Sequence, residues 1–192
     1  MEKLTGLRKV KTAVFISGTG SNLKNLIKFS KIKNSPISII LIISNTTQAK
    51  GLKYANQFNI KKKIFNFQNF TDAEKNISTL LKKEKIKFIC LAGFMKILSK
   101  DFIKKFEGKI VNIHPSLLPK YKGLNTHNRA IKNQDKFAGC TVHYVTAQLD
   151  SGKTILQKKI RITLKDNETT LAKKVLKQEH KLYPAAIIKI FN

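Results

Sequence analysis

The feature that most constrains the fold is an alternation of short apolar runs with segments of helical spacing through the first half of the chain. One apolar run, residues 37–44, is almost entirely Ile and Leu, as expected of a parallel strand covered on both faces. Further strands are predicted at 10–17, 63–67 and 88–92, and helices at 23–30, 49–58 and 72–84. This order is typical of an α/β fold with an open, mostly parallel, Rossmann-like sheet flanked by helices.

The second half departs from strict alternation. Strands at 141–145 and 154–163, on either side of an Asp150-Ser151-Gly152 turn, predict an antiparallel hairpin added to the sheet. Residues 115–123 contain two prolines and a glycine and predict an ordered loop. The remaining expected elements are helices at 98–106, 126–133 and 168–190 and a strand at 110–113. We expect one domain over residues 1–192.

Composition narrows the class of protein. With 42% hydrophobic residues among 192, the chain can bury a core. No apolar run approaches the ~20 residues of a bilayer span, and residues 1–12 lack the pattern of a secretory signal. The expected location is therefore the cytoplasm, with no membrane partner. Cys90 and Cys140 lie in apolar stretches and are expected to be reduced, buried thiols.

The net charge of +27 raises the question of a nucleic-acid partner. Arginine, which reads phosphates and bases bidentately, occurs only at Arg8, Arg129 and Arg161, and the lysines are spread along the whole chain. We interpret the charge as a diffuse solvated surface and expect no specific nucleic acid. A functional basic patch is the alternative, and an anionic small substrate would gain from the field in either case.

Two segments fall where predicted strands end, which is where ligands bind in open α/β sheets. The first, residues 18–22, reads Gly-Thr-Gly-Ser-Asn and opens a predicted helix, so its backbone N–H groups could bind an anion. It matches neither a dinucleotide fingerprint nor a P-loop. A tight turn with Ser21 as the helix cap is the alternative.

The second segment is Asn112-Ile113-His114-Pro115-Ser116. Side chains alternate along a strand, so Asn112 and His114 share a face and could stabilise an oxyanion together. Asp150, in a turn beside Gly152, could hold or tune the imidazole, although a structural histidine and a turn aspartate are the alternatives. No serine lies in a nucleophile elbow, and His114, His127, His143 and His180 show no metal-ligand spacing, so no metal is expected.

These motifs carry a resemblance to a known family. Residues 16–23, 91–95 and 112–119, the Leu149-Asp150-Ser151-Gly152 turn and Gln178-Glu179-His180 together resemble the phosphoribosylglycinamide formyltransferases of the formyltransferase superfamily, in one register from about Thr12 to Phe191. The resemblance implies a cytoplasmic enzyme of purine biosynthesis. It would transfer the formyl group of 10-formyltetrahydrofolate, as co-substrate, to the amino group of glycinamide ribonucleotide, as a monomer or homodimer.

The resemblance also implies roles for individual residues. Asn112, His114 and Asp150 correspond to the catalytic trio, with His114 as proton donor, Asp150 raising its pKa, and the amine attacking directly. Gly20, Ser21, Asn22 and Glu179 correspond to the glycinamide ribonucleotide site. The folate segment corresponds to Met95, Lys96, Ile97 and Leu98, with Asn112 as a further contact.

Three positions depart from the family pattern: Lys96 and Ala73, where Arg is expected or frequent, and Asn125, where His is common. Two other superfamily activities are alternatives, formyltetrahydrofolate hydrolase and methionyl-tRNA formyltransferase, but both normally carry another domain. A non-catalytic nucleotide-binding module is the alternative from a different class. A complete Asn112, His114 and Asp150 set argues against it, because a binding module needs no proton donor.

Overall fold

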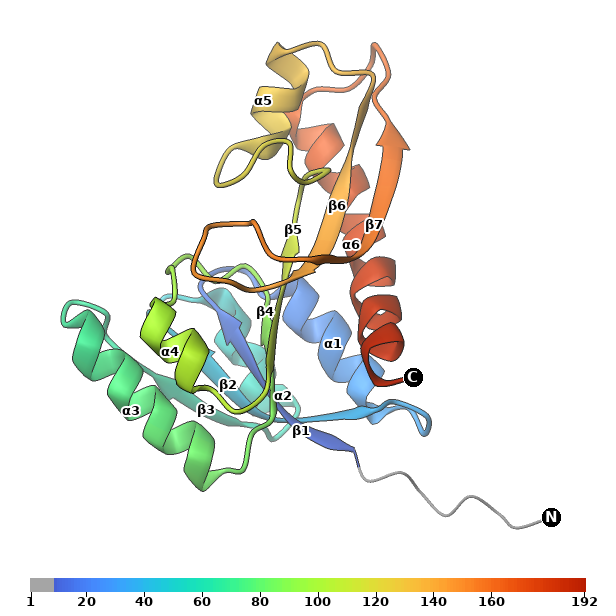
Figure 1. Cartoon of the computed structure of the whole chain (residues 1–192). Helices are drawn as coiled ribbons and strands as arrows, with labels where there is room; N and C mark the ends of the chain where they lie inside the picture. Colours follow the sequence, from blue (N-terminus) through green and yellow to red (C-terminus); the bar gives the residue numbers. More distant parts are fainter. Residues whose placement is uncertain (1–8) are drawn as a thin grey trace. The chain divides into compact units, whose positions relative to one another are not determined.

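A computed structural model describes residues 9–192 (Figure 1). The chain divides into two compact units. The first comprises the described residues up to Lys96, with Phe106–Lys109 and Phe191–Asn192. The second comprises Ile97–Lys105 and Ile110–Ile190.

The first unit is a parallel α/β unit. Its strands are β1 (Val10–Ile16), β2 (Ile37–Ser44), β3 (Lys61–Ile64) and β4 (Phe88–Leu91), in the order β3-β2-β1-β4. Each neighbouring pair is parallel, so their carboxyl ends lie at one edge. The connecting helices are α1 (Ser21–Lys31), a 3-10 turn η1 (Lys50–Leu52) leading into α2 (Lys53–Gln57), and α3 (Phe70–Lys83).

The core of this unit follows from its sequence. β2 lies between β1 and β3, and its Leu41, Ile42 and Ile43 are fully buried. Amphipathic α1 buries Leu23, Leu26 and Ile27. β3 is an edge strand, and all of its side chains, three lysines and Ile64, are exposed.

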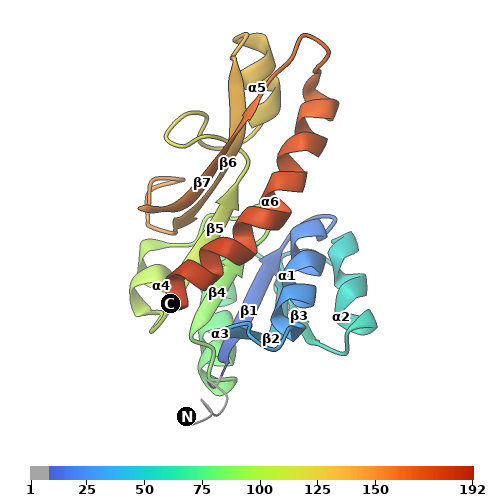
Figure 2. The same ribbon diagram turned by 90° about the vertical axis from the view of Figure 1, so that its right-hand side faces the viewer.

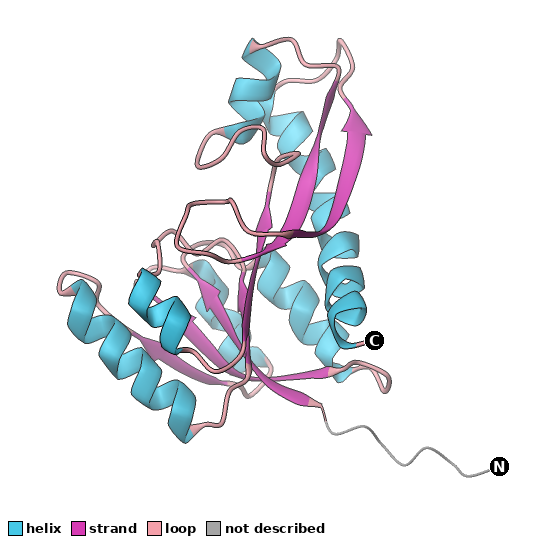
Figure 3. Ribbon diagram, viewed as in Figure 1, coloured by secondary structure: helices cyan, strands magenta, loops and turns pink. Residues whose placement is uncertain are grey.

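The second unit contains the antiparallel part of the fold, with strands in magenta and helices in cyan in Figure 3. β5 (Lys109–His114) pairs antiparallel with β6 (Phe137–Tyr144), which pairs antiparallel with β7 (Thr154–Arg161). Its helices are α4 (Lys100–Lys105), α5 (Thr126–Lys132) and α6 (Glu168–Phe191), and Figure 2 shows α6 along its full length. The expected α/β class and the C-terminal hairpin are confirmed.

Several boundaries differ from the expectations. The helix expected at 49–58 begins as the 3-10 turn η1, and α2 has only five residues. The strand expected at 63–67 is β3 at Lys61–Ile64, because pairing with β2 ends at Ser44↔Ile64. β6 begins at Phe137, four residues before the expected start, because Ala138, Gly139 and Cys140 pair with β7. Among residues 9–192 no helix is both long and apolar enough to cross a membrane.

Candidate active site

The second unit gathers the acid–base side chains at the carboxyl end of β5. Asn112 and His114 are two residues apart on this strand and therefore share a face, as predicted. The antiparallel register places His143 opposite Asn112 and Thr141 opposite His114. Four polar side chains from two strands thus meet on one side of the sheet.

Asp150 completes this cluster from the segment between β6 and β7. Its Oδ2 lies 3.3 Å from His114 Nδ1, and its Oδ1 lies 3.6 Å from His143 Nε2. The side chains of His114 and Asp150 are each only 7% exposed, so solvent screens their interaction weakly. The amide Nδ2 of Asn112 lies 3.3 Å from His143 Nε2. The structure therefore brings the predicted Asn112, His114 and Asp150 together.

The loop after β5 supplies two backbone groups to the same cluster. His114 Nε2 lies 2.8 Å from the carbonyl oxygen of Tyr121, which can only accept a hydrogen bond, so this nitrogen carries a proton. The N–H of Gly123 donates to Asp150 Oδ2 at 2.9 Å. Both ring nitrogens of His114 face acceptors, an arrangement that suits the doubly protonated ring.

Burial and charge act on the His114 pKa in opposite directions. Burial lowers the pKa of His114 below its usual value, and the hydrogen bond to Tyr121 and the charge of Asp150 raise it without offsetting the whole effect. Asp150 thus raises the pKa of His114, as expected, but burial lowers this pKa by more. The pKa of Asp150 is lowered: burial raises it, but the His143 side chain, the Gly123 N–H and the nearby His114 outweigh that effect. Asp150 is therefore a carboxylate at neutral pH.

In the first unit the glycine-rich segment leads into α1. Gly20 is the residue before the helix, in left-handed conformation with φ 75°, and no side chain caps the first turn. The alternative with Ser21 as cap is therefore wrong, because the helix begins at Ser21. A Cβ on Gly20 would stand 2.6 Å from the Cα of Gly51, so glycine is also required for packing.

The expected folate segment begins after β4 in the first unit. The hydroxyl of Ser17 accepts a hydrogen bond from the N–H of Met95 at 2.8 Å, and the N–H of Ser17 donates to the Gly93 carbonyl at 3.0 Å. Met95 and Ile97 are 61% and 59% exposed. Lys96 is exposed and Leu98 is buried.

The other residues named from the sequence have varied surroundings. Asn22 is buried on α1, and Glu179 is buried on α6. Ala73 is buried on α3, and Asn125 precedes α5 in left-handed conformation. Cys90 and Cys140 are buried and form no disulfide, as expected. Within the described part of the chain, no group of three or more His, Cys, Asp or Glu side chains could hold a metal ion.

Three groups of this cluster were not predicted from the sequence: His143, the Tyr121 carbonyl and the Gly123 N–H. One signal was present for His143. Thr141-Val142-His143 repeats the polar-apolar-polar pattern of Asn112-Ile113-His114, as expected if two strands share a polar face. Side-chain patterns carry no signal for the two backbone groups.

Parallel strands that end in a glycine-rich loop, and a largely buried cluster of Asn112, His114 and Asp150, define the class of this protein as an α/β enzyme. Comparison with known proteins identifies the family within this class. The chain belongs to the formyl transferase family, whose model, described as "Formyl transferase", matches residues 10–187.

Two curated relatives are similar to the chain. Phosphoribosylglycinamide formyltransferase of Haemophilus influenzae is 42% identical over 180 residues, which cover 92% of this chain and 85% of the relative. The trifunctional purine biosynthetic protein adenosine-3 of Gallus gallus is 41% identical over 182 residues, which cover 93% of this chain. The chain spans only 18% of that larger relative's length.

Solved structures agree with this assignment. Phosphoribosylglycinamide formyltransferase from Brucella melitensis is similar with a TM-score of 0.90 and 41% identity, covering 96% of both chains. The enzyme from Coxiella burnetii is similar with a TM-score of 0.88 and 40% identity, covering 94% of this chain and 86% of that one. The expected Rossmann-like fold is thus also the fold of these neighbours.

Proposed function

We propose that this chain is a phosphoribosylglycinamide formyltransferase of purine biosynthesis, with 10-formyltetrahydrofolate as formyl donor and glycinamide ribonucleotide as acceptor. The single observation that carries the proposal is the buried cluster in which Asp150 lies between His114 and His143, beside Asn112. The family match and the relatives' names support the choice of substrates. The match runs through both compact units, so we treat residues 1–192 as one formyltransferase domain, which we expect in the cytoplasm.

In the proposed reaction the amino group of glycinamide ribonucleotide attacks the formyl carbon directly. A C–N bond forms to the acceptor, the bond from the formyl carbon to the folate nitrogen breaks, and one amine proton is transferred to that nitrogen. Negative charge develops on the formyl oxygen in between. The protein must therefore stabilise an oxyanion and move a proton, and it needs no nucleophile of its own.

The cluster has groups for both tasks. The amide of Asn112 has two N–H donors, of which His143 engages one, so the other can donate to the oxyanion. His114 holds one proton at Nε2 against Tyr121, and Asp150 stabilises a second at Nδ1. The His114 ring is therefore the proposed proton donor, and Asp150 is the group that favours its charged form.

The binding assignments rest on the resemblance and on local geometry. Gly20, Ser21 and Asn22 form the start of α1, where the N-cap residue is a glycine with no side chain to bond to the first turn and the helix dipole suits the ribonucleotide phosphate. Glu179 is proposed as a further substrate contact. Met95, Lys96, Ile97 and Leu98, with Asn112, are proposed to contact the folate, whose aromatic rings suit the exposed apolar Met95 and Ile97. We expect no metal and no specific nucleic acid.

A formyl-transfer assay tests the proposal. Purified protein with 10-formyltetrahydrofolate should formylate glycinamide ribonucleotide, and it should release little formate when water is the only acceptor. His114→Ala should lower kcat at least ~10²-fold, the usual contribution of a general acid–base group, while nucleotide binding persists. Formate as the main product would favour the hydrolase, and transfer to charged initiator tRNA would favour the tRNA formyltransferase. Nucleotide binding without any turnover would favour the non-catalytic nucleotide-binding module.

A further inference from the structure

The loop between β5 and α5 contacts both members of the His114–Asp150 pair through its backbone. The Tyr121 carbonyl lies 2.8 Å from His114 Nε2, and the Gly123 N–H lies 2.9 Å from Asp150 Oδ2. These two groups are only two residues apart. Movement of the segment Tyr121–Gly123 would therefore disturb the imidazole and the carboxylate together.

The backbone of this segment needs support from outside. Tyr121 has φ 58° and Gly123 has φ 76°, both in the left-handed region. Glycine adopts this conformation readily, whereas tyrosine does so at a conformational cost. Contacts of the Tyr121–Gly123 segment with the rest of the unit must therefore hold Tyr121 in place.

Arg129, on α5, makes two of these contacts. Its Nη1 donates to the carbonyl of Lys122 at 2.7 Å, and its guanidinium carbon lies 4.8 Å from the centre of the Tyr121 ring. The first contact fixes the peptide that carries the Gly123 N–H, the donor to Asp150. The second holds the ring of the strained residue by stacking, for which a planar guanidinium is suited.

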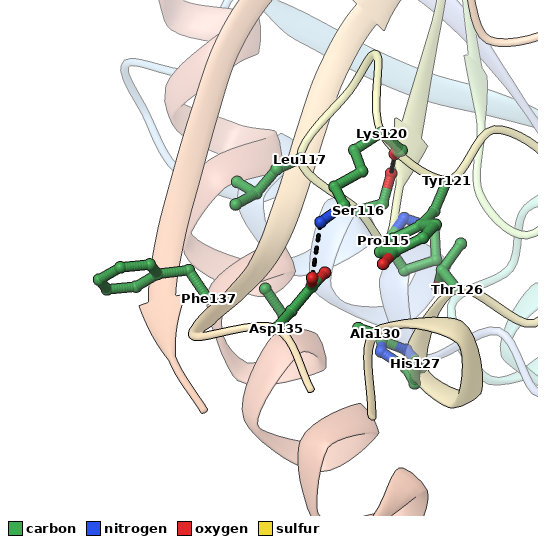
Figure 4. Close-up of a pocket in the computed structure, with 11 residues that line it drawn as sticks. Pro115, Ser116, Leu117, Lys120, Tyr121, Thr126, His127, Ala130, Asp135 and Phe137 are labelled. Carbon is green, nitrogen blue, oxygen red and sulfur yellow. Dashed lines mark hydrogen bonds and ion pairs between the residues drawn. The ribbon is translucent and has the colours of Figure 1, made fainter. Parts of the chain in front are cut away.

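Other side chains also hold the loop, including its centre, where Lys122 Nζ donates to Ser151 Oγ at 2.5 Å and Lys120 Nζ lies 5.0 Å from the centre of the Tyr121 ring. Ser116 Oγ donates to the Lys120 carbonyl at 2.6 Å, and Lys120 Nζ lies 2.6 Å from Asp135 Oδ1. Figure 4 shows this ion pair as a dashed line. Asn133 Nδ2 donates to the Tyr121 hydroxyl at 2.7 Å. Arg129 is the one residue among these that contacts both the ring of Tyr121 and the next peptide.

We propose that Arg129 is a positioning residue for formyl transfer: by fixing the Tyr121–Gly123 segment, it keeps a backbone acceptor on His114 Nε2 and a backbone donor on Asp150. This inference rests on the proposed roles of His114 and Asp150. It adds a function for a side chain that touches neither.

The proposal makes a prediction that differs from a simple effect of charge. The charged and titratable groups that act on His114 are Asp150, His143 and Arg129, and His127 on α5 interacts with it as well. The positive charge of Arg129 lowers the pKa of His114, whereas the Tyr121 hydrogen bond that it supports raises that pKa. Loss of charge and loss of positioning therefore move the His114 pKa in opposite directions.

Arg129→Lys separates the two effects, because lysine keeps the charge but lacks the planar group that stacks and donates in fixed directions. Positioning predicts that the His114 pKa falls by about half a unit to one unit in this variant, the effect of one weakened hydrogen bond. At a pH above that pKa, kcat should fall about three- to tenfold. Arg129→Met is the second variant. Lys132→Met, also exposed on α5, removes one charge as a control.

The readouts are the pH dependence of kcat and KM for each variant, and the ¹⁵N NMR titration of the His114 ring. Unchanged kcat and an unchanged titration in Arg129→Lys would overturn the proposal, as would an upward pKa shift in Arg129→Met equal to that in Lys132→Met. The NMR titration reports on the ring whether or not His114 is the proton donor. A further outcome is that the His114 pKa shifts in Arg129→Lys while His114→Ala keeps full turnover. Arg129 then affects the His114 ring but has no role in formyl transfer. Both the positioning proposal and the proposed proton donor would be rejected.

Discussion

Replacement of Asp150 by Asn tests the electrostatics of the site most directly. Asn is nearly isosteric and keeps an oxygen for the Gly123 N–H, so the change removes mainly the negative charge 3.3 Å from His114 Nδ1. Asp150 raises the pKa of His114, and its loss must lower that pKa further below the usual range.

The size of the effect follows from Coulomb's law. At 3.3 Å the attraction between the carboxylate and the imidazolium is about 1.3 kcal/mol in bulk water and about 5 kcal/mol at an effective dielectric constant of about 20. Both side chains are only 7% exposed, so the aqueous figure is a lower bound. At 1.36 kcal/mol per unit, the His114 pKa should fall by at least about one unit.

The assay is kcat as a function of pH between about 5 and 8.5, a range that brackets the usual histidine pKa. Since the proposed donor is the protonated ring, activity declines as pH rises through the His114 pKa. In Asp150→Asn this decline should move at least about one unit lower, with at least a tenfold loss of kcat above it. Asp101→Asn, an exposed carboxylate on α4, is the control for charge. If kcat of Asp150→Asn declined at the same pH as kcat of the wild type, the proposed role of Asp150 in raising the His114 pKa would be refuted.

Two further predictions concern binding and stability. Gly20→Ala should lower the Tm because of the clash with Gly51, whereas Gly18→Ala, whose Cβ meets nothing within 4 Å, should keep the Tm but raise KM for the nucleotide more than for the folate. Steady-state kinetics with thermal denaturation check this, and an unchanged nucleotide KM in both variants would place the phosphate elsewhere. Burial lowers the pKa of His114, His127 and His180, so the unfolded chain binds protons first and the Tm should fall as pH decreases through about 6.5. His127→Asn should reduce this fall, and a slope equal to wild type would contradict the prediction.

Patterns local in sequence predicted most of the fold and part of the site. The period-two alternation in Asn112-Ile113-His114 was sufficient to place the amide and the imidazole on one face, and the family motif added Asp150. His143, the partner of Asn112, could not be predicted from a pattern within one strand. The connection from β5 to β6 runs through a loop and α5, so the register that sets His143 opposite Asn112 depends on packing of the whole unit.

The backbone groups that contact His114 and Asp150 could not be predicted from the sequence, for a different reason. The Tyr121 carbonyl and the Gly123 N–H are present in any sequence, and only the left-handed turn directs them at the pair. A tyrosine gives no sign of that conformation, in contrast to a glycine. The 3-10 start of α2 was missed for a similar reason, because apolar spacing does not separate a 3-10 turn from an α-helical one.

The exposed lysines of β3 have a consequence for how copies of this protein behave at high concentration. A free sheet edge offers unpaired backbone groups on which the edge of another molecule can dock, and such docking begins aggregation. Here Lys61, Lys62 and Lys63 line that edge, and the ion pair with Glu84 offsets only Lys61. Two such edges would repel each other, more weakly as salt is added. On this reasoning, part of the large positive charge should oppose docking of one β3 edge on another, an effect that requires no anionic partner.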